Sequence, residues 1–328
     1  ARKVVYYSTT EDYEKIPGVP IAYWISKRLF EIFENEKCVG NYAEPRVGLQ
    51  TGENEKFVRL WTEIDYTKMK TDAGSLEVAK KSCAKWFPYN KGGEYRKWYG
   101  NNEYVVDWYN DGQNIKQDKL AKLAIGKCLP SNAKPKNVQY YFKPSITWSK
   151  ISSGRIAFRY KGKGHIFDIA GASIFANSTI IKYMLGFCNS TVAYEIMRIF
   201  STTMNYEAGN VSKLPLIIDK QFKNEIENLV ERNIEISKED WDDFETSWDF
   251  KKHPIIEFKS NNIENSFKNW SEFAEKQFNQ LKSNEEELNR IFIDIYGLQD
   301  ELAPEVEDKD ITIRKADRDR EMKSFISY

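Results

Sequence analysis

Residues 145–216 read SITWSKISSGRIAFRYKGKGHIFDIAGASIFANSTIIKYMLGFCNSTVAYEIMRIFSTTMNYEAGNVSKLPL, and the side-chain pattern changes character within them. The first part alternates basic and apolar side chains, a pattern typical of β-strands. Its basic members are Arg155, Arg159, Lys161 and Lys163, separated by Ile156, Phe158 and Tyr160. The second part has apolar residues at helical spacing and ends at Leu214-Pro215-Leu216, because proline stops the pattern. The sequence therefore predicts a mixed α+β fold, with a strand-rich basic surface followed by packed helices.

The composition is that of a globular protein with room for two domains. The chain has 328 residues, of which 41% are hydrophobic and 14% aromatic. No run of eighteen apolar residues occurs, so no membrane span is expected. The first residues, ARKVVYYSTTEDYEK, lack a signal peptide's apolar core and an initiator Met, so we expect a part of a longer, cytoplasmic protein. The four cysteines show no metal-ligand spacing and are expected to be reduced, buried thiols.

The net charge of zero conceals a strong asymmetry along the chain. Residues 81–163 hold 17 Lys and Arg against 5 Asp and Glu, a net charge of +12. Residues 219–328 hold 17 against 28, a net charge of −11. Such asymmetry indicates a nucleic-acid face on the basic part. The alternative is that the two parts neutralise each other by packing together.

Three segments follow from these patterns. Residues 1–37 are expected to be a helical lead-in, whose amphipathic helix has Ile21 and Trp24 on its core side. Residues 38–218 are expected to be the strand-rich domain. Residues 219–328 are expected to form a helical, acidic domain, with apolar stripes at 267–281 and 288–295 and a mostly solvated segment at 303–323.

The stretch 42–54 contains two glycines, a proline and small polar residues. Glycine lets the backbone approach a ligand closely. Arg46, Thr51 and Asn54 therefore form a candidate phosphate or base contact, although a plain loop explains the stretch equally well. A strand is expected after it, at 57–61.

Residues 86–109 interleave aromatic and basic side chains. Nine of these 24 residues are aromatic, and Lys85, Lys91, Arg96 and Lys97 lie next to or among them. Positive charge suits phosphates and flat rings suit bases, which favours a nucleic-acid surface. We expect most of the rings to build a small β core, with a strand at 104–108, and the loop-borne Lys and Arg to lie outside.

The long stretch quoted above predicts further local features. Two strands, 145–149 and 155–160, are expected to pair across a Ser-Ser-Gly turn, and Ser178 and Asn189 are candidate helix caps. Asn205 and Tyr206 either touch DNA or order their loop. His165 has no Cys or second His near it, so no metal site is expected.

Several motifs together carry a resemblance to a known family. They are IPGVPIAYW (16–24), PRVGLQTGENEKFVRLW (45–61), KWFPYNKGGEYRKWYG (85–100), SGRIAFRYKGKGHIFDIAG (153–171), MNYEAG (204–209) with LPL (214–216), and ELNRIFIDIYGL (287–298). In these motifs the chain resembles the C-terminal half of the adenine-specific DNA methyltransferases of BREX phage-exclusion systems. More broadly it resembles the target-recognition region of type IIG restriction-modification enzymes.

The resemblance implies a specificity module that selects a short DNA sequence for a methylating domain earlier in the parent chain. An N6-adenine methyltransferase needs an Asn/Asp-Pro-Pro-aromatic element to hold the flipped base. Phe87-Pro88-Tyr89-Asn90 has one proline and the wrong order, and no glycine-rich turn for S-adenosylmethionine follows a strand. We therefore expect no catalytic residue, cofactor or metal in this chain, and S-adenosylmethionine in the full-length parent.

The expected partners are double-stranded DNA, the parent's own methyltransferase domain, and other defence-system subunits or phage inhibitor proteins, with no membrane. A protein-interaction module, in which the basic face docks an acidic partner, is the alternative. The predicted DNA-binding residues are Arg46, Thr51, Asn54, Lys85, Lys91, Arg96, Lys97, Lys143, Lys150, Arg155, Arg159, Lys161, Lys163, Asn205 and Tyr206.

Overall fold

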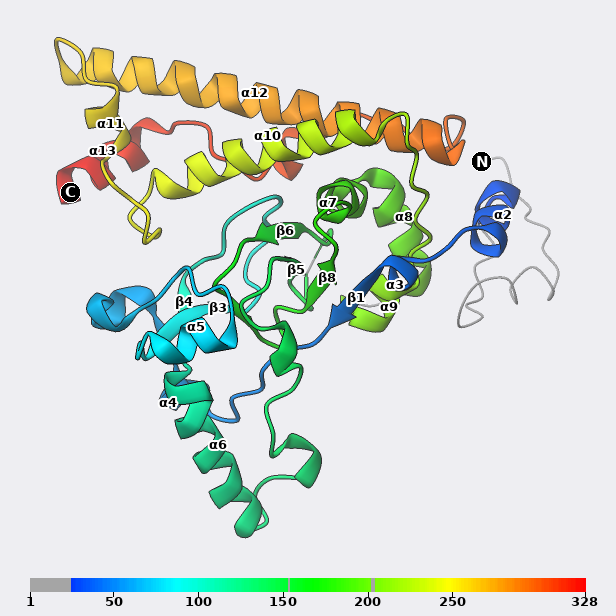
Figure 1. Cartoon of the computed structure of the whole chain (residues 1–328). Coiled ribbons are helices and arrows are strands. Elements are labelled where there is room, and N and C mark those ends of the chain that lie inside the picture. The colour runs from blue at the N-terminus through cyan, green and yellow to red at the C-terminus, as the bar shows by residue number, and fades with distance from the viewer. Residues whose placement is uncertain (1–24, 153, 202–203) are drawn as a thin grey trace.

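The computed structural model describes residues 25–152, 154–201 and 204–328. Within them two four-stranded sheets form the middle of the molecule, with α10 and α12 above them, α7 and α8 beside them and α6 below them (Figure 1). The mixed α+β class predicted from the sequence is confirmed. The expected core positions Ile21 and Trp24, and the motif at 16–24, lie outside the described residues.

The first sheet has the strand order β1-β8-β5-β6, with all neighbours antiparallel. Its strands are β1 (Ala43–Arg46), β5 (Ser145–Trp148), β6 (Phe158–Lys161) and β8 (Ser173–Ala176). The pairing of β5 with β6, in the register Thr147 opposite Arg159, confirms the two strands predicted on either side of the Ser-Ser-Gly turn.

The second sheet has the order β2-β4-β3-β7, and only the β3–β7 pair is parallel. Its strands are β2 (Val58–Leu60), β3 (Trp86–Asn90), β4 (Tyr104–Asp107) and β7 (Ile166–Phe167). The strands predicted at 57–61 and 104–108 are confirmed with shorter bounds, because Phe57 ends a short helix, Trp61 begins a 3-10 turn and Trp108 precedes α6. A separate apolar cluster under this sheet includes Phe87, Trp108 and Phe142.

The helices lie in several groups. Those before and between the strands are α2 (Lys27–Asn35), α3 (Val39–Tyr42), α4 (Asn54–Phe57), α5 (Leu76–Lys81) and α6 (Tyr109–Ala124). Those after the strands are α7 (Ile181–Asn189), α8 (Thr191–Phe200), α9 (Ala208–Ser212), α10 (Lys223–Asp242), α11 (Pro254–Glu257), α12 (Ile263–Tyr296) and α13 (Arg318–Ser327). Single 3-10 turns are η1 (Trp61–Glu63), η2 (Tyr66–Lys68), η3 (Pro130–Asn132), η4 (Val138–Tyr140) and η5 (Asp308–Asp310).

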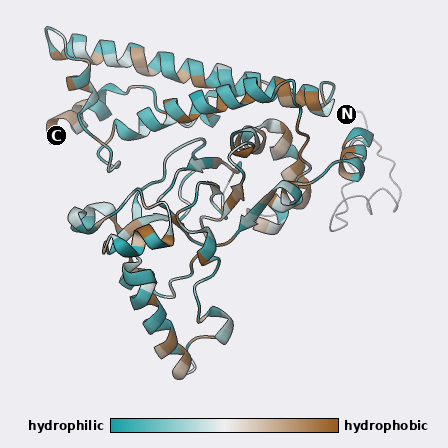
Figure 2. Cartoon of the chain, in the orientation of Figure 1, coloured by the Kyte–Doolittle hydropathy of each residue, from teal (hydrophilic) through white to brown (hydrophobic). Residues whose placement is uncertain are grey.

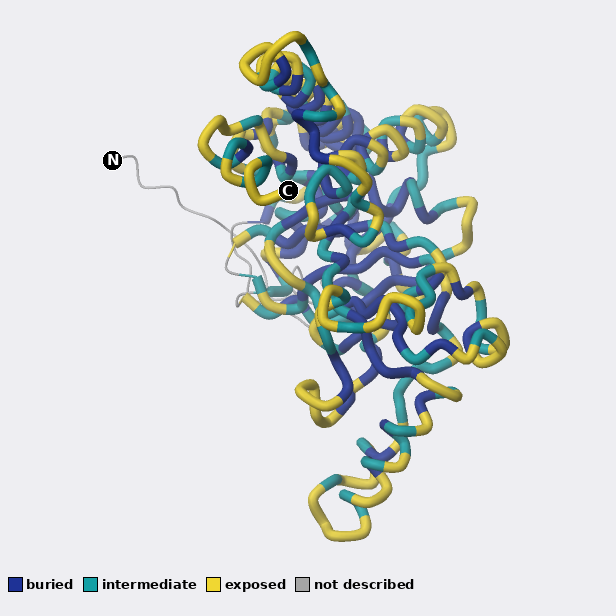
Figure 3. Tube along the Cα trace, turned by 90° about the vertical axis from the view of Figure 1, so that its left-hand side faces the viewer, coloured by how far each residue is buried: buried dark blue, intermediate teal, exposed yellow. Residues whose placement is uncertain are grey.

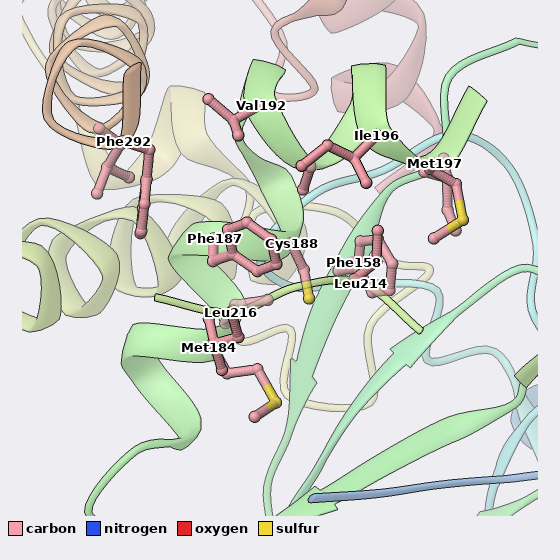
Figure 4. Close-up of a cluster of buried hydrophobic side chains, with 14 of the residues drawn as sticks. Phe158, Met184, Phe187, Cys188, Val192, Ile196, Met197, Leu214, Leu216 and Phe292 are labelled. Carbon is pink, nitrogen blue, oxygen red and sulfur yellow. The ribbon is translucent and has the colours of Figure 1, made fainter. Parts of the chain in front are cut away.

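The main hydrophobic core lies between the first sheet and the helices. It combines Phe33 of α2, Phe158 of β6, Phe187 of α7 and Phe292 of α12 with many smaller side chains (Figure 4). Figure 2 shows α7 and α8 as strongly hydrophobic, whereas α10 and α12 are hydrophilic over most of their surface. One core therefore takes side chains from all three segments expected from the sequence.

Helix α6 and the loop after it extend away from this core. Figure 1 shows the extension below the sheets, and most of it is exposed in Figure 3. Three large apolar side chains on it are more than half exposed: Leu120, Ile125 and Leu129. We call residues 109–136 the arm.

Both predicted helix caps are wrong. The α7 cap position is Ile180, and the Ser178 hydroxyl instead donates to the Asn177 side chain. Helix α8 is capped by Ser190, whose hydroxyl accepts from the amide of Ala193 at 3.2 Å. Asn189 is occupied elsewhere, because its side chain pairs with both backbone groups of Phe158 at 2.9 and 3.0 Å.

The segment 303–323 is more structured than predicted. Val306, Ile311 and Ile313 are buried in the main core, and the first turn of α13 begins at Arg318. This segment returns along α12 and places Asp310 beside Arg155, where the carboxylate and guanidinium are 2.9 Å apart. The two apolar stripes predicted in the tail lie on one helix, α12.

Candidate nucleic-acid interface

Two of the predicted DNA contacts, Arg96 and Lys97, are buried against the acidic tail. Arg96 Nη2 lies 2.5 Å from Asp240 of α10, and Lys97 Nζ lies 2.5 Å from Glu285 of α12. The other Glu285 oxygen accepts from the indole N–H of Trp98 at 2.7 Å. Arg96 and Lys97 are 7% and 5% exposed. The expectation that these loop-borne cations lie outside is wrong, because carboxylates of the tail hold them in the interior.

Arg159 and Lys161 are also buried, each at 1% exposure. The chain around Trp98 pairs with β6. The Trp98 amide donates to the Phe158 carbonyl at 2.9 Å, and the Tyr160 amide donates to the Trp98 carbonyl at 2.8 Å. This extra pairing covers the strand that the alternating pattern placed at the surface. The expected exposure of Arg159 and Lys161 is therefore wrong.

Backbone and side-chain oxygens of the protein accept the hydrogen bonds of these two cations. The Arg159 guanidinium donates to the Arg96 carbonyl at 2.9 Å and to Ser149 Oγ at 3.2 Å. Lys161 Nζ donates to the Gly100 carbonyl at 2.7 Å and to the Asn102 side chain. Burial lowers the pKa of Arg159 to about 9 and holds the pKa of Lys161 well below its usual value.

Six of the other predicted residues lie around one pair of neighbouring hollows, which we call the loop face. The first hollow has a volume of about 600 Å³ and brings together Thr51, Asn54, Lys91, Lys150 and Asn205. The second has a volume of about 390 Å³, contains Arg155, and shares Gly93 and Ile151 with the first. Residues from five separate stretches, near 52, 92, 151, 169 and 205, thus meet at one surface.

The rim near residue 52 is built by a hydrogen-bonded turn. The buried Thr51 hydroxyl donates to Asn54 Oδ1 at 2.7 Å and accepts from the Glu53 amide at 3.3 Å. Gly52 adopts a φ of 83°, a conformation that suits glycine, and nothing lies within 4 Å of its Cβ position. The exposed Asn54 side chain is therefore held at the hollow through its Oδ1 atom.

The cations of the loop face each have a carboxylate beside them. Lys91 Nζ lies 3.5 Å from Asp168, and Lys150 Nζ lies 2.9 Å from Glu207. The hydrogen bond from Lys150 lowers the pKa of Glu207. Arg155 contacts Asp310 and donates to the Thr191 hydroxyl at 3.0 Å. These pairs are partly exposed, so an incoming anion can compete for the cations.

Asn205 and Tyr206 have different positions. Asn205 Nδ2 donates to Glu207 at 2.9 Å, whereas its Oδ1 is buried without a hydrogen-bond partner in the described chain. Tyr206 is 7% exposed, and its hydroxyl donates to the Gly154 carbonyl at 3.1 Å. Its own carbonyl accepts from the Trp148 indole at 2.9 Å. For Tyr206 the structure favours the alternative in which it orders the loop.

The remaining predicted residues lie away from the loop face. Arg46 pairs with Glu44 at 2.5 Å beside a third hollow, of about 630 Å³, which Lys143 lines. Lys85 is half-buried near Asp107 at 3.7 Å, and Lys163 is exposed.

Sequence reasoning missed several residues of the loop face. Gln50, Ser149 and Asp168 line the first hollow, and Ile151 lines both hollows. The signal available for Ile151 was an apolar residue within the polar turn SKISSG. No local signal marks Ser149, because its place depends on strand pairing and on its 2.8 Å hydrogen bond to the Gly93 carbonyl.

The described residues include no cluster of three or more His, Cys, Asp or Glu side chains arranged to hold a metal ion. Nor does any helix in that part of the chain combine the length and apolarity needed to cross a bilayer.

Comparison with known proteins finds two relatives that are both named adenine-specific methyltransferases. No family model matches the chain. The adenine-specific methyltransferase PglX of Lacticaseibacillus casei is 41% identical over 331 residues, which is 99% of this chain and 27% of that protein. The adenine-specific methyltransferase BrxX of Escherichia coli is 34% identical over 292 residues, which is 88% of this chain and 22% of that protein.

Among solved structures, the type IIL restriction-modification enzyme MmeI, determined in complex with DNA, is similar to 89% of this chain and 36% of its own. Its TM-score is 0.49 and its sequence identity is 15%. The chain spans about a quarter of the length of the two methyltransferases. It is homologous to the C-terminal part of the adenine-specific methyltransferases PglX and BrxX.

Proposed function

We propose that this chain is the DNA target-recognition module of an adenine-specific methyltransferase of phage defence. It positions duplex DNA for a methylating domain in another part of a PglX-like protein, in the cytoplasm. The observation that carries this proposal is the loop face, where six residues expected to bind DNA converge from distant parts of the sequence. Homology to proteins named adenine-specific methyltransferases supports it. The methyl donor, S-adenosylmethionine, would bind the methylating domain.

The loop face offers the two kinds of group that DNA recognition needs. Lys91, Lys150 and Arg155 supply positive charge for phosphates, which fixes register without selecting sequence. Asn54 supplies an exposed side-chain amide of the kind that pairs with adenine edges, whereas Glu207 holds the Asn205 amide. Phosphate would replace the carboxylates that now accompany the cations, so binding should depend strongly on salt.

A salt series on a random-sequence duplex tests the proposal. The variant Lys91→Gln/Lys150→Gln/Arg155→Gln should bind all sequences more weakly and reduce the slope of log affinity against log salt by about 0.9 for each phosphate that the variant no longer neutralises. The matched control, Lys127→Gln/Lys134→Gln/Lys268→Gln, removes three exposed lysines away from the loop face. An unchanged slope in the first variant, or an equal fall in both, would contradict the proposal.

A second candidate function is a protein-interaction module for the parent's methyltransferase domain, other defence-system subunits or phage inhibitor proteins. The arm favours it, because Leu120, Ile125 and Leu129 are 58%, 66% and 67% exposed. Exposed apolar side chains gathered on one extension are typical of protein contacts. Size-exclusion chromatography with a candidate partner, with and without competing DNA, separates the two functions.

A further inference from the structure

We infer that Ile151 and Met204 form an apolar wedge that enters a groove of duplex DNA and parts a base step. This inference rests on the proposed DNA binding and adds a specific role for two residues. Both side chains are large, apolar and exposed, at 72% and 59%. Ile151 lines both hollows of the loop face, and Met204 directly precedes Asn205, which lines the first hollow.

The two residues sit on a pair of backbone segments that brace each other. Ile151 bridges antiparallel to Asn205, the Ser152 amide donates to the Met204 carbonyl at 3.1 Å, and the Tyr206 amide donates to the Lys150 carbonyl at 2.7 Å. These bonds form a short two-stranded tongue. A side chain that is to separate stacked bases needs such support, because a freely moving loop would yield before the bases did.

Buried side chains anchor the tongue at its base. The Trp148 indole, which is fully buried, donates to the Tyr206 carbonyl at 2.9 Å. The Tyr206 hydroxyl donates back to the Gly154 carbonyl, and the Ser152 hydroxyl donates to the Arg155 carbonyl at 2.9 Å. The exposed Ile151 and Met204 are thus carried by a backbone that is tied to the core of the first sheet.

The surroundings of the wedge suit DNA. Lys150 precedes Ile151 directly, and Arg155 lies in the second hollow, which Ile151 also lines. Ile151 lies on the border between the two hollows. Phosphates in the first hollow would meet Lys91 and Lys150, and phosphates in the second would meet Arg155. Two apolar side chains flanked by cations and amides form too small a patch for a stable protein interface. Isoleucine and methionine are among the residues that proteins insert between base steps.

The test compares the Ile151→Ser/Met204→Ser variant with the unaltered chain on two duplexes, one fully paired and one with a central mismatch. A mismatch removes part of the cost of parting the bases, so the unaltered chain should bind it about tenfold more tightly. The variant should lose this preference while keeping its salt slope. Permanganate should show unstacked thymines on a long duplex with the unaltered chain and not with the variant.

The matched control is Ile125→Ser/Leu129→Ser, which removes two exposed apolar side chains from the arm. It should keep the mismatch preference, and all variants should keep the thermal melting temperature of the unaltered chain. A variant at 151 and 204 that retains both the preference and the thymine reactivity would overturn the wedge alone. If the unaltered chain binds neither duplex at low salt, the proposed function fails and the wedge with it. If the Ile151→Ser/Met204→Ser variant keeps its DNA binding and loses binding to a protein partner, Ile151 and Met204 form a protein contact and the wedge is overturned.

Discussion

Lys97 and Glu285 meet in the interior although 188 residues separate them in the sequence. Burial by itself would lower the pKa of Lys97, but Glu285 and Tyr95 together outweigh this effect and hold the pKa above its usual value. Lys97 therefore remains protonated in the folded protein. The importance of the pair appears when one partner is removed, because a single buried charge is costly.

Replacing Lys97 with Met should destabilise the chain by about 3–5 kcal/mol, since Glu285 would stay buried with only the Trp98 indole as a partner. Urea denaturation followed by circular dichroism measures the loss. The control is Lys268→Met on α12, the helix that carries Glu285, because the ion pair of Lys268 with Glu272 is exposed and should contribute less than about 1 kcal/mol. Equal losses in the two variants would contradict this account.

Asp243 should make stability depend on pH in a direction unusual for a carboxylate. Burial, followed by the nearby Asp240 and Glu239, raises the pKa of Asp243 to about 8. An unfolded Asp titrates near pH 4, at about 3.9, so between these values the folded state holds a proton that the unfolded state has released. This group therefore makes stability fall as pH rises from about 4 to about 8.

Asp243→Asn should remove that fall, because an amide cannot ionise. The urea midpoint of this variant should vary less between about pH 5 and about pH 8 and should exceed that of the unaltered chain at about pH 8. Asp300→Asn, at an exposed position, serves as the control. A pH profile that is the same in Asp243→Asn as in the unaltered chain would show that Asp243 titrates normally.

At this scale six of the fifteen residues predicted to bind DNA line the loop face, and the sequence did not show which of the others are buried. Thr51, Asn54, Lys91, Lys150 and Asn205 were chosen from loop composition and do line one hollow. Arg159 was placed outside because alternation along a strand says nothing about a covering segment. The pairing of Trp98 with β6 decides its burial, and that pairing joins residues about 60 positions apart.

At the scale of elements, α7 and α10 pack closely because α7 has a glycine at their contact. A Cβ on Gly186 would lie 2.9 Å from Val230 Cγ2 and 3.2 Å from Ile226 Cγ2. Both of these side chains are fully buried, so neither can move away without disturbing its neighbours.

Gly186→Ala should therefore destabilise the chain by about 1–3 kcal/mol, even though alanine favours a helix by about 1 kcal/mol. Gly209→Ala is the matched control, since Gly209 also lies in a helix but nothing is within 4 Å of its Cβ position. That control should be neutral or stabilising by about 0.5–1 kcal/mol. Denaturation midpoints of the two variants check the difference, and a stabilised Gly186→Ala would refute the close packing.

Elements were predicted better than their ends. The strands β4, β5 and β6 and the long apolar stripes of α12 follow from alternation and helical spacing within the local sequence. The caps of α7 and α8 do not follow from the local sequence, because a side chain that could cap a helix can form hydrogen bonds with another element instead. Asn189 pairs with the backbone of Phe158 on β6, and the neighbouring Ser190 caps α8 instead.

At the scale of the whole molecule, the opposite charges of the two segments partly neutralise each other. The ion pairs Arg96–Asp240, Lys97–Glu285 and Arg155–Asp310 join the basic segment to the tail. Part of the positive charge is therefore neutralised by packing against the tail, whereas Lys91 and Lys150 of the loop face stay partly exposed and pair outside the tail. Composition alone could not show which basic residues pair with the tail and which stay exposed.

The strand-rich segment 38–218 should not fold without the tail. Without residues 219–328, Arg96 and Lys97 would have no carboxylates beside them, and Phe187, which stacks on Tyr296 with ring centroids 5.6 Å apart, would be uncovered. Segment 38–218 expressed alone should be insoluble or lack a cooperative thermal transition. Co-expression of 219–328 should restore both properties. A soluble, cooperatively melting 38–218 would show that the segments are independent domains.

The most direct test of the DNA-binding proposal is hydrogen–deuterium exchange of the chain with and without a random-sequence duplex at low salt. Exchange should slow in peptides covering 50–54, 91–95, 149–152 and 204–207, which belong to the loop face, and should stay unchanged in the arm at 109–136. Slowing confined to the arm, or no change anywhere when the duplex is present in excess, would contradict the proposal that the loop face holds DNA.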